Sequence, residues 1–247
     1  MFAWHFAFHA YLVDGGIWDE RLLLMAVLTT LWGCRLTFNF WRKGGYKLSE
    51  EDYRWAVLRQ YMHWTMFEVL NIVFIAGYQH VLLLLLVVPS YVVSFNRHEE
   101  LNAVDGAATL LFLLFLMLET VADQQQWNFY KKKYELVAQK KPLTGDNKAG
   151  FNCSGLFRYS RHPNFFGEMS LWWAFYLFSV AVSEPVFNPS SLGTMLLTLL
   201  FQGSAPFTEF ITASKYPLYK QYQSRVPMLI PWFSSTTNTP IYDTHHK

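Results

Sequence analysis

The stretch AATLLFLLFLMLETVA, residues 107–122, decides the class of this protein, because Glu119 is its only charged residue. Two more stretches share this character, LLLMAVLTTLWG (22–33) and HVLLLLLVVPSYVV (80–93). Runs of this length and apolarity are typical of helices that cross a membrane. The composition agrees: 52% of the 247 residues are hydrophobic and 15% are charged, whereas soluble domains contain about 25% charged residues. We therefore expect an integral membrane protein.

Working outward from these runs, the sequence predicts an all-α fold, a polytopic transmembrane helix bundle with about five to six spanning helices. Five spans are placed at roughly residues 20–41, 63–95, 102–122, 166–183 and 191–212. The aromatic-rich residues 1–13 form either a shortened sixth span or an interfacial helix. The 63–95 stretch is long for one crossing and contains Pro89, which indicates a kink or an extension beyond the bilayer.

The predicted domain organisation is simple. Residues 1–233 form one transmembrane domain, whose first 19 residues are a shortened or interfacial segment. Residues 234–247 form a polar tail, which we expect to be held by other membrane-protein subunits.

The basic residues predict the orientation in the membrane. Of the 20 lysines and arginines, 17 lie in the segments 42–60, 123–165 and 213–247. Five spans place these three segments on the same side. The positive-inside rule assigns that side to the cytosol, or to the matrix of a mitochondrion.

Several classes of protein are not supported by the composition. The net charge of +2 is too small to indicate a nucleic-acid partner. Two cysteines, Cys34 and Cys153, do not make a disulfide framework. The first apolar stretch lacks the basic flank and the cleavage site of a secretory signal peptide. We also expect no metal site.

Charged residues inside the predicted spans are candidates for function, because a charge in the bilayer is costly. Arg35 lies within the first long span and either faces the bundle interior or snorkels to the surface. It pairs with a carboxylate or binds an anionic ligand, and the sequence leaves both readings open. Asp105 and Glu119 either serve a site or stay hydrated near helix ends.

The segment GLFRYSRHPNFFGE, residues 155–168, marks a polar boundary before an apolar run. Part of it fits the ordinary start of a span. Ser160 is a suitable N-cap, Pro163 is tolerated early in a helix, and Arg158 and Arg161 can snorkel.

Three further residues of this segment point to a ligand. Asn164 and Glu168 lie one turn apart on one helix face, and His162 precedes them beside Arg161. They combine cationic donors for phosphate, an amide for a planar ring and a carboxylate that orients both. A helix N-terminus also favours an anion. The segment therefore predicts a site for a phosphate-bearing cofactor, built from membrane helices because the glycine pattern of a soluble dinucleotide fold is absent.

The extended motif GLFRYSRHPNFFGEMSLWW (155–173) closely resembles the signature of the steroid 5-alpha-reductase-like membrane proteins, specifically the branch catalogued as a domain of unknown function. Other blocks agree in order and spacing: LWGCRLTFNFWRKG with SEEDYRW (31–55), ADQQ (122–125) and YPLYKQYQSRVPMLIPWF (216–233). The resemblance covers about residues 18–233.

This resemblance implies a bundle of about six or seven helices, with NADPH in a cytosol-facing cavity and a lipid substrate that enters from the membrane. Members of the family reduce an activated carbon–carbon double bond: one carbon receives a hydride, and a protein acid protonates the other carbon or the conjugated oxygen. Matching positions give the cofactor-binding set: Asp123, Arg161, His162 and Asn164, with Glu168 in support, Arg35 and Arg54 near phosphate, and Tyr219 and Tyr222 in the tail motif that closes over the cofactor.

The chain also departs from the family pattern. Relatives typically place further basic residues just after the position of Glu209, where this chain reads EFITASK. They often have a basic and an acidic residue at the positions of Gly150 and Cys153. The front of the chain is short, and Trp32 occupies about the place of a tyrosine in the steroid reductases. No catalytic proton donor is therefore assigned.

Three functions follow as hypotheses. The first is an NADPH-dependent reductase of a carbon–carbon double bond in a sterol, steroid or unsaturated acyl lipid, in the endoplasmic reticulum membrane. The second is a non-catalytic subunit of a larger membrane complex, with the mitochondrial inner membrane as the alternative location. The third is a lipid or prenyl-cysteine methyltransferase, whose family shares an RHPN-like boundary and a Y..Y tail, but the LWGCRL and EDYRW blocks count against it. All three predict membrane lipids as partners, and the first and third also predict a lipid-like substrate.

Overall fold

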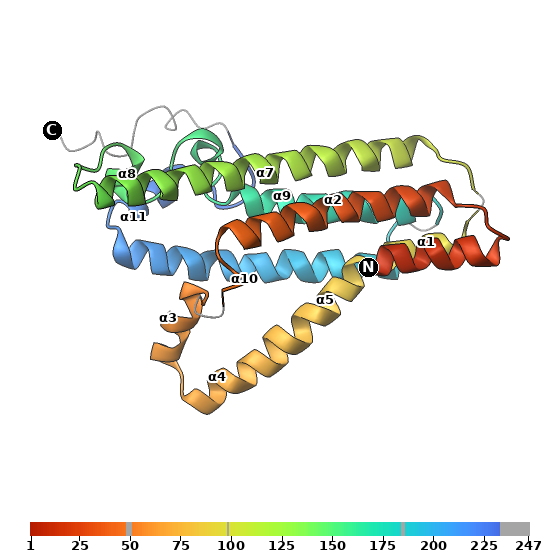
Figure 1. The fold of residues 1–247 in the computed structure, drawn as a ribbon, viewed down its shortest axis with the longest axis horizontal. Helices are drawn as coiled ribbons and strands as arrows, with labels where there is room; N and C mark the ends of the chain where they lie inside the picture. The colour runs from red at the N-terminus through yellow and green to blue at the C-terminus, as the bar shows by residue number, and fades with distance from the viewer. Residues whose placement is uncertain (48–50, 98, 184–185, 233–247) are drawn as a thin grey trace. The chain divides into compact units, whose positions relative to one another are not determined.

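The computed structural model describes residues 1–47, 51–97, 99–183 and 186–232 (Figure 1). Across these residues every regular element is a helix and none is a strand, which confirms the all-α prediction. The polar tail at 234–247, with its predicted partner contacts, lies outside the described residues.

The chain divides into two compact units. Unit 1 comprises Met1–Leu116 and Met169–Leu200, and unit 2 comprises Met117–Glu168 and Phe201–Lys247. Three long helices contribute to both units: α7 (Ala103–Ala138), α9 (Pro163–Val180) and α10 (Leu192–Lys215).

The remaining elements belong to one unit each. Those of unit 1 are α1 (Phe2–Val13), α2 (Glu20–Arg42), α3 (Tyr53–Tyr61), α4 (Trp64–Leu70), the π-helix η1 (Asn71–Tyr78), α5 (Gln79–Leu86), α6 (Val88–Phe95) and the short 3-10 helix η3 (Pro189–Ser191). Those of unit 2 are α8 (Asp146–Ala149), the 3-10 helix η2 (Gly155–Arg158) and α11 (Tyr219–Arg225).

Among the described residues, three helical stretches are long and apolar enough to cross a membrane: α2, the stretch Trp64–Phe95 and α7. The prediction of five to six spans is thus corrected to three. The other two predicted spans form α9 and α10, which are less apolar. Polar residues lower their apolarity: Asn164 and Glu168 lie in the first two turns of α9, and Glu209 and Lys215 lie in the last part of α10.

The N-terminal segment forms α1, whose 12 residues extend about 18 Å at 1.5 Å per residue. This is shorter than the hydrocarbon core of about 30 Å, so the segment is short, as predicted. Ala3, Ala7 and Ala10 are its buried residues, and α1 packs against α2 and α6. One small side chain per turn allows the helix backbones to approach closely.

The stretch Trp64–Phe95 is not one regular helix. From α4 the chain continues through the π-helix into α5 as one rod (Figure 1). The rod ends at Val87, where φ is −99° and ψ is 1°, and α6 begins with Pro89 in its first turn. Proline has no N–H and fits the first turn of a helix but not its interior. The kink predicted from Pro89 is therefore confirmed.

Unit 1 contains a buried ion pair that the sequence did not predict. Arg21 donates from Nε to Asp105 Oδ1 at 2.8 Å and from Nη2 to Oδ2 at 2.7 Å. It also donates to the backbone carbonyls of Glu99 and Glu100. Asp105 is 2% exposed and Glu119, in unit 2, is 5% exposed. The reading that both carboxylates stay hydrated at helix ends is therefore wrong.

Unit 2 has an aromatic core in which the tail motif packs on the loop after α8. Phe151 lies 4.9 Å from Tyr219 and 5.3 Å from Tyr222 between ring centroids. Ala149 and Val226 complete this buried cluster. Aromatic pairs at such distances stabilise a core beyond their area burial.

Candidate functional site

The candidate site lies in unit 2 around Glu209, on the second half of α10. Its Oε1 accepts hydrogen bonds from Arg161 Nε at 2.6 Å and from His162 Nε2 at 3.0 Å. Its Oε2 accepts from Arg161 Nη2 at 3.0 Å and from Gln223 Nε2 at 2.7 Å. Since an ionised carboxylate only accepts, the histidine carries its proton on Nε2. The Arg161–Glu209 pair has the bidentate geometry of the stronger ion pairs.

This environment keeps Glu209 ionised. Burial by itself raises the pKa of the Glu209 carboxyl, but hydrogen bonds from His162, Arg161 and Gln223 outweigh burial and lower the pKa to about 2. Hydrogen bonds to the charged form of an acid favour that form. The carboxylate therefore serves as a permanent anion that holds the three donors.

The other donors of Arg161 hold the C-terminal segment. Its Nη1 donates to the carbonyl of Gln223 at 2.9 Å and to that of Val226. The backbone N–H of Arg161 donates to the Pro227 carbonyl at 2.9 Å. Arg161 thus links α10 to the end of α11 and to the residues that follow. Such a link fixes where the first turn of α9 begins.

Two tail-side contacts strengthen this link. Ser160 Oγ donates to the carbonyl of Leu229 at 2.6 Å, and the Tyr222 hydroxyl donates to the carbonyl of Phe157. Burial raises the pKa of the Tyr222 phenol well above its usual value, so the group stays a donor. Tyr219 and Tyr222, predicted to close over a cofactor, are both buried in the aromatic core of unit 2.

A second polar group lies where α9 begins beside α7. Asn164 Nδ2 lies 3.5 Å from Asp123 Oδ1, at the outer limit of a hydrogen bond. A Cβ built on Gly167 would lie 2.9 Å from Cβ of Glu119, so the two helices approach closely there. Asp123 is 5% exposed, and Asn164 and Glu168 are half-buried. The structure thus brings two predicted cofactor residues, Asp123 and Asn164, next to each other.

Arg35 and Arg54, the two residues predicted to lie near the cofactor phosphate, belong to unit 1. Arg35 is half-buried on α2. Arg54, in α3, donates from Nη2 to Asp52 Oδ2 at 2.6 Å and from Nε to Oδ1 at 3.0 Å. Although burial opposes it, the hydrogen bonds with Arg54 lower the pKa of the Asp52 carboxyl. The charge of Arg54 is therefore already matched by a neighbour.

Sequence reasoning missed the partners of Arg161, namely Glu209 and Gln223. A signal was present for one of them, because Glu209 is a lone carboxylate in an otherwise apolar segment, and such a residue needs a partner. No comparable signal marks Gln223, which follows Tyr222 in a polar helix.

The chain is similar to proteins whose function is not known. The family described as "Protein of unknown function (DUF1295)" matches residues 1–226. An uncharacterised protein of Schizosaccharomyces pombe is 38% identical over an alignment of 245 residues, and the match covers 93% of this chain and 68% of the relative. No solved structure matches.

Proposed function

Because the chain belongs to the DUF1295 family of proteins of unknown function, we propose its activity from the chemistry of its own residues: an NADPH-dependent reductase of a carbon–carbon double bond in a membrane lipid. The lipid is a sterol, a steroid or an unsaturated acyl chain. The proposal also includes membership of the wider steroid 5-alpha-reductase-like group and a location in the endoplasmic reticulum.

The observation that carries this proposal is the contact between buried Asp123 and half-buried Asn164. The motifs that resemble the reductases contribute one residue each: ADQQ contributes Asp123, and RHPN contributes Asn164. These residues are 41 positions apart, yet their side chains lie 3.5 Å from each other. An amide and a carboxylate at one place offer both donors and acceptors, which suits the carboxamide and the ribose hydroxyls at the nicotinamide end of the cofactor.

Arg161 and His162, which the sequence predicted to bind the cofactor, already hold other groups of the protein. Arg161 donates through Nε and Nη2 to Glu209 and through Nη1 to the carbonyls of Gln223 and Val226. His162 donates to the same carboxylate. We therefore give Arg161 and His162 a positioning role: they hold the first turn of α9 so that Asn164 keeps its place beside Asp123. Glu168, one turn after Asn164, lies on the same face and supports it.

The chemistry that NADPH supplies when bound is a hydride for one carbon of the double bond. The task of the chain is to orient the acceptor, because correct placement of the reacting groups lowers the activation barrier by several kcal/mol. A lipid substrate is supported by the three apolar helical stretches, since a membrane protein meets such a substrate in the bilayer.

The test is NADPH binding by the full chain in detergent, measured by isothermal titration calorimetry. We expect saturable binding that Asn164→Ala weakens about tenfold, because each lost hydrogen bond costs about 0.5–1.5 kcal/mol and about 1.4 kcal/mol corresponds to a factor of ten. Asn128→Ala is the matched control. Asn128 is exposed on α7, where it accepts from Gln124 at 2.8 Å, and its removal should leave the affinity unchanged.

The outcomes separate the reductase from its rivals. A folded wild-type chain that binds no NADPH at millimolar concentration would overturn the reductase proposal and favour a non-catalytic membrane subunit. Binding of S-adenosyl-methionine in place of NADPH would favour the methyltransferase. Equal weakening by Asn164→Ala and Asn128→Ala would place the cofactor elsewhere.

A further inference from the structure

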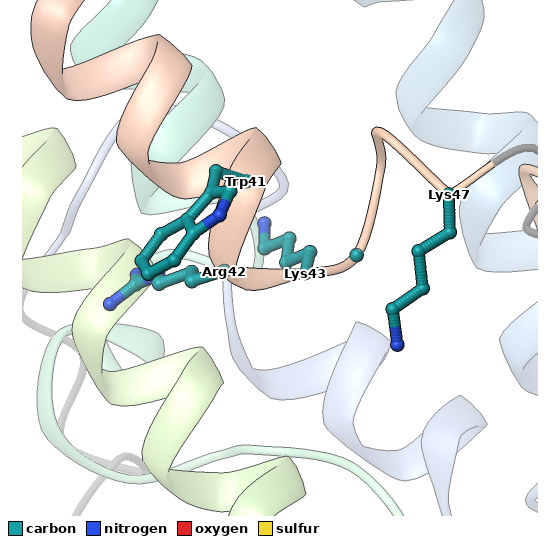
Figure 2. A pocket seen from close by; sticks show the side chains of 5 residues that line it. Trp41, Arg42, Lys43 and Lys47 are labelled. Atoms are coloured by element: carbon teal, nitrogen blue, oxygen red, sulfur yellow. The ribbon is translucent and has the colours of Figure 1, made fainter.

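The end of α2 carries a cationic cavity outside the candidate site. The cavity has a volume of about 480 Å³ and is lined by Trp41, Arg42, Lys43, Gly44 and Lys47. Figure 2 shows the labelled side chains along the last turn of α2 and the loop that follows it. Three of these five residues are positively charged and none is negatively charged. We call this cavity the α2-end pocket.

The backbone around the α2-end pocket is held in a defined turn. The N–H of Gly44 donates to the Trp41 carbonyl and the N–H of Gly45 donates to the Phe40 carbonyl, both at 2.9 Å. With Gly44 at φ +80°, these bonds form the Schellman motif that ends many helices. The N–H of Lys47 then donates to the Gly44 carbonyl at 2.9 Å. The backbone of the lysines is therefore preorganised rather than loose.

Packing reinforces the turn. A Cβ built on Gly45 would lie 2.5 Å from the Phe40 ring, so the chain passes directly over that ring. Tyr46 meets the same ring edge-on, with the centroids 4.9 Å apart. A hydrophobic contact of this kind commonly accompanies the Schellman motif. The turn thus has both hydrogen bonds and apolar contacts to keep its shape.

Two exposed lysines supply the charge that the α2-end pocket offers to a ligand. Lys43 and Lys47 are exposed, and among the described residues neither ammonium group has a hydrogen-bond or ion-pair partner. The guanidinium of Arg42 lies 5.4 Å from the centroid of the Phe38 ring. The end of a helix carries about half a negative charge, which the two lysines outweigh. The pocket therefore presents net positive charge at one end of a helix that is apolar enough to span the membrane.

We propose that the α2-end pocket binds a phosphate group, supplied by the head group of an anionic membrane lipid or by a soluble phosphate compound. Lysine ammonium groups bind phosphate as point charges. A basic cluster beside the end of a span meets anionic head groups at the membrane surface. The volume falls within the range of small-ligand sites, about 300–1,000 Å³. This site does not depend on the proposed reductase activity.

The experiment is native mass spectrometry of the full chain released from detergent, with dioctanoyl phosphatidic acid as the lipid probe. We expect one saturable binding event per chain. Lys43→Gln combined with Lys47→Gln should weaken it about 30-fold, which corresponds to about 2 kcal/mol at about 1 kcal/mol for each lysine. The matched control is Lys131→Gln with Lys132→Gln. Both of these lysines are exposed on α7, so the control removes the same charge away from the pocket and should change the affinity less than twofold.

Two further arms identify the source of the phosphate. Glycerol 3-phosphate that competes with the lipid at equal concentration indicates a soluble ligand, and failure to compete indicates a lipid head group. Dioctanoyl phosphatidylcholine, which is neutral overall, should bind at least tenfold more weakly. The proposal is overturned if the wild-type chain shows no saturable binding, if both double variants weaken it equally, or if the neutral lipid binds as well. Unchanged circular dichroism of the variants serves as the folding control.

Discussion

Replacing Glu209 by Gln should destabilise unit 2 more than any other change of one polar atom in the candidate site. The substitution removes the charge that compensates Arg161, whose side chain is 10% exposed. It also puts an NH2 donor in place of one of the two carboxylate oxygens. At Oε1 this donor would face Arg161 Nε and His162 Nε2, and at Oε2 it would face Arg161 Nη2 and Gln223 Nε2, all of which are donors. Breaking a buried ion pair from one side costs about 3–5 kcal/mol.

This cost can be measured as a shift in thermal unfolding of the detergent-solubilised chain, followed by circular dichroism. For a chain of this length, about 1 kcal/mol shifts the midpoint by about 2–4 °C, so we expect a loss of about 10 °C. Glu135→Gln is the control, because Glu135 is exposed on α7, and its substitution should change stability by less than about 0.5 kcal/mol.

A double-mutant cycle tests whether the cost comes from the pair itself. Arg161→Gln with Glu209→Gln should cost less than the two single changes added together, by at least about 1 kcal/mol, because the double variant leaves no unpaired charge. A Glu209→Gln midpoint within 2 °C of the wild type, or strictly additive single costs, would refute the reasoning that Glu209 braces the start of α9.

Three other predictions use the same structure. The pKa of Glu209 is lowered to about 2 from an ordinary 4.5, which adds up to about 3 kcal/mol to the free energy of unfolding. This contribution is fully present above about pH 4.5 and is lost as the pH falls towards 2. The difference in stability between wild type and Glu209→Gln should therefore become smaller from pH 7 to pH 3, and a constant difference would contradict this. Gly150→Ala should destabilise the protein by more than about 1 kcal/mol, because φ is +96° and the new Cβ would lie 2.2 Å from the Tyr216 ring. Gly33→Ala in α2, with open space around it, should be neutral or stabilising by up to about 1 kcal/mol. An unchanged or higher thermal midpoint for Gly150→Ala would contradict the first expectation, and a lower midpoint for Gly33→Ala would contradict the second. Segments 42–60 and 123–165 should face the same side of the membrane, since two spans separate them whether the chain has three spans or five. Trypsin added to sealed, right-side-out microsomes should cut after the exposed Lys140 and Lys141. Protection of these lysines would reverse the predicted orientation.

Local features of the fold were readable from the sequence. Apolar runs such as 107–122 predicted helices because helix formation and membrane burial depend on neighbouring residues. Pro89 predicted the break before α6 for the same reason, since the missing N–H acts within one helical turn. The π-helix over Asn71–Tyr78 was not predicted, because nothing in its apolar sequence distinguishes it from an α-helix.

The candidate site was only partly readable. The RHPN segment identified Arg161, His162 and Asn164 as residues of interest, because charged and amide groups at the edge of an apolar run are costly unless they are used. Their partners were not identified. The sequence assigned Arg161 to a phosphate, and this role stays a prediction, whereas in the structure its guanidinium holds Glu209, 48 residues away.

The pairings themselves were decided by tertiary structure alone. Arg21 meets Asp105 across 84 positions, and Asn164 meets Asp123 across 41 positions. Hydropathy periodicity says which face of a helix is buried, but it does not say which helix covers that face. A buried polar group must find a partner wherever packing brings one within hydrogen-bond distance, because leaving the group unpaired costs more than the hydrogen bond contributes. The sequence therefore determined that these polar and charged residues needed partners, and the packing of the helices decided which partners they have.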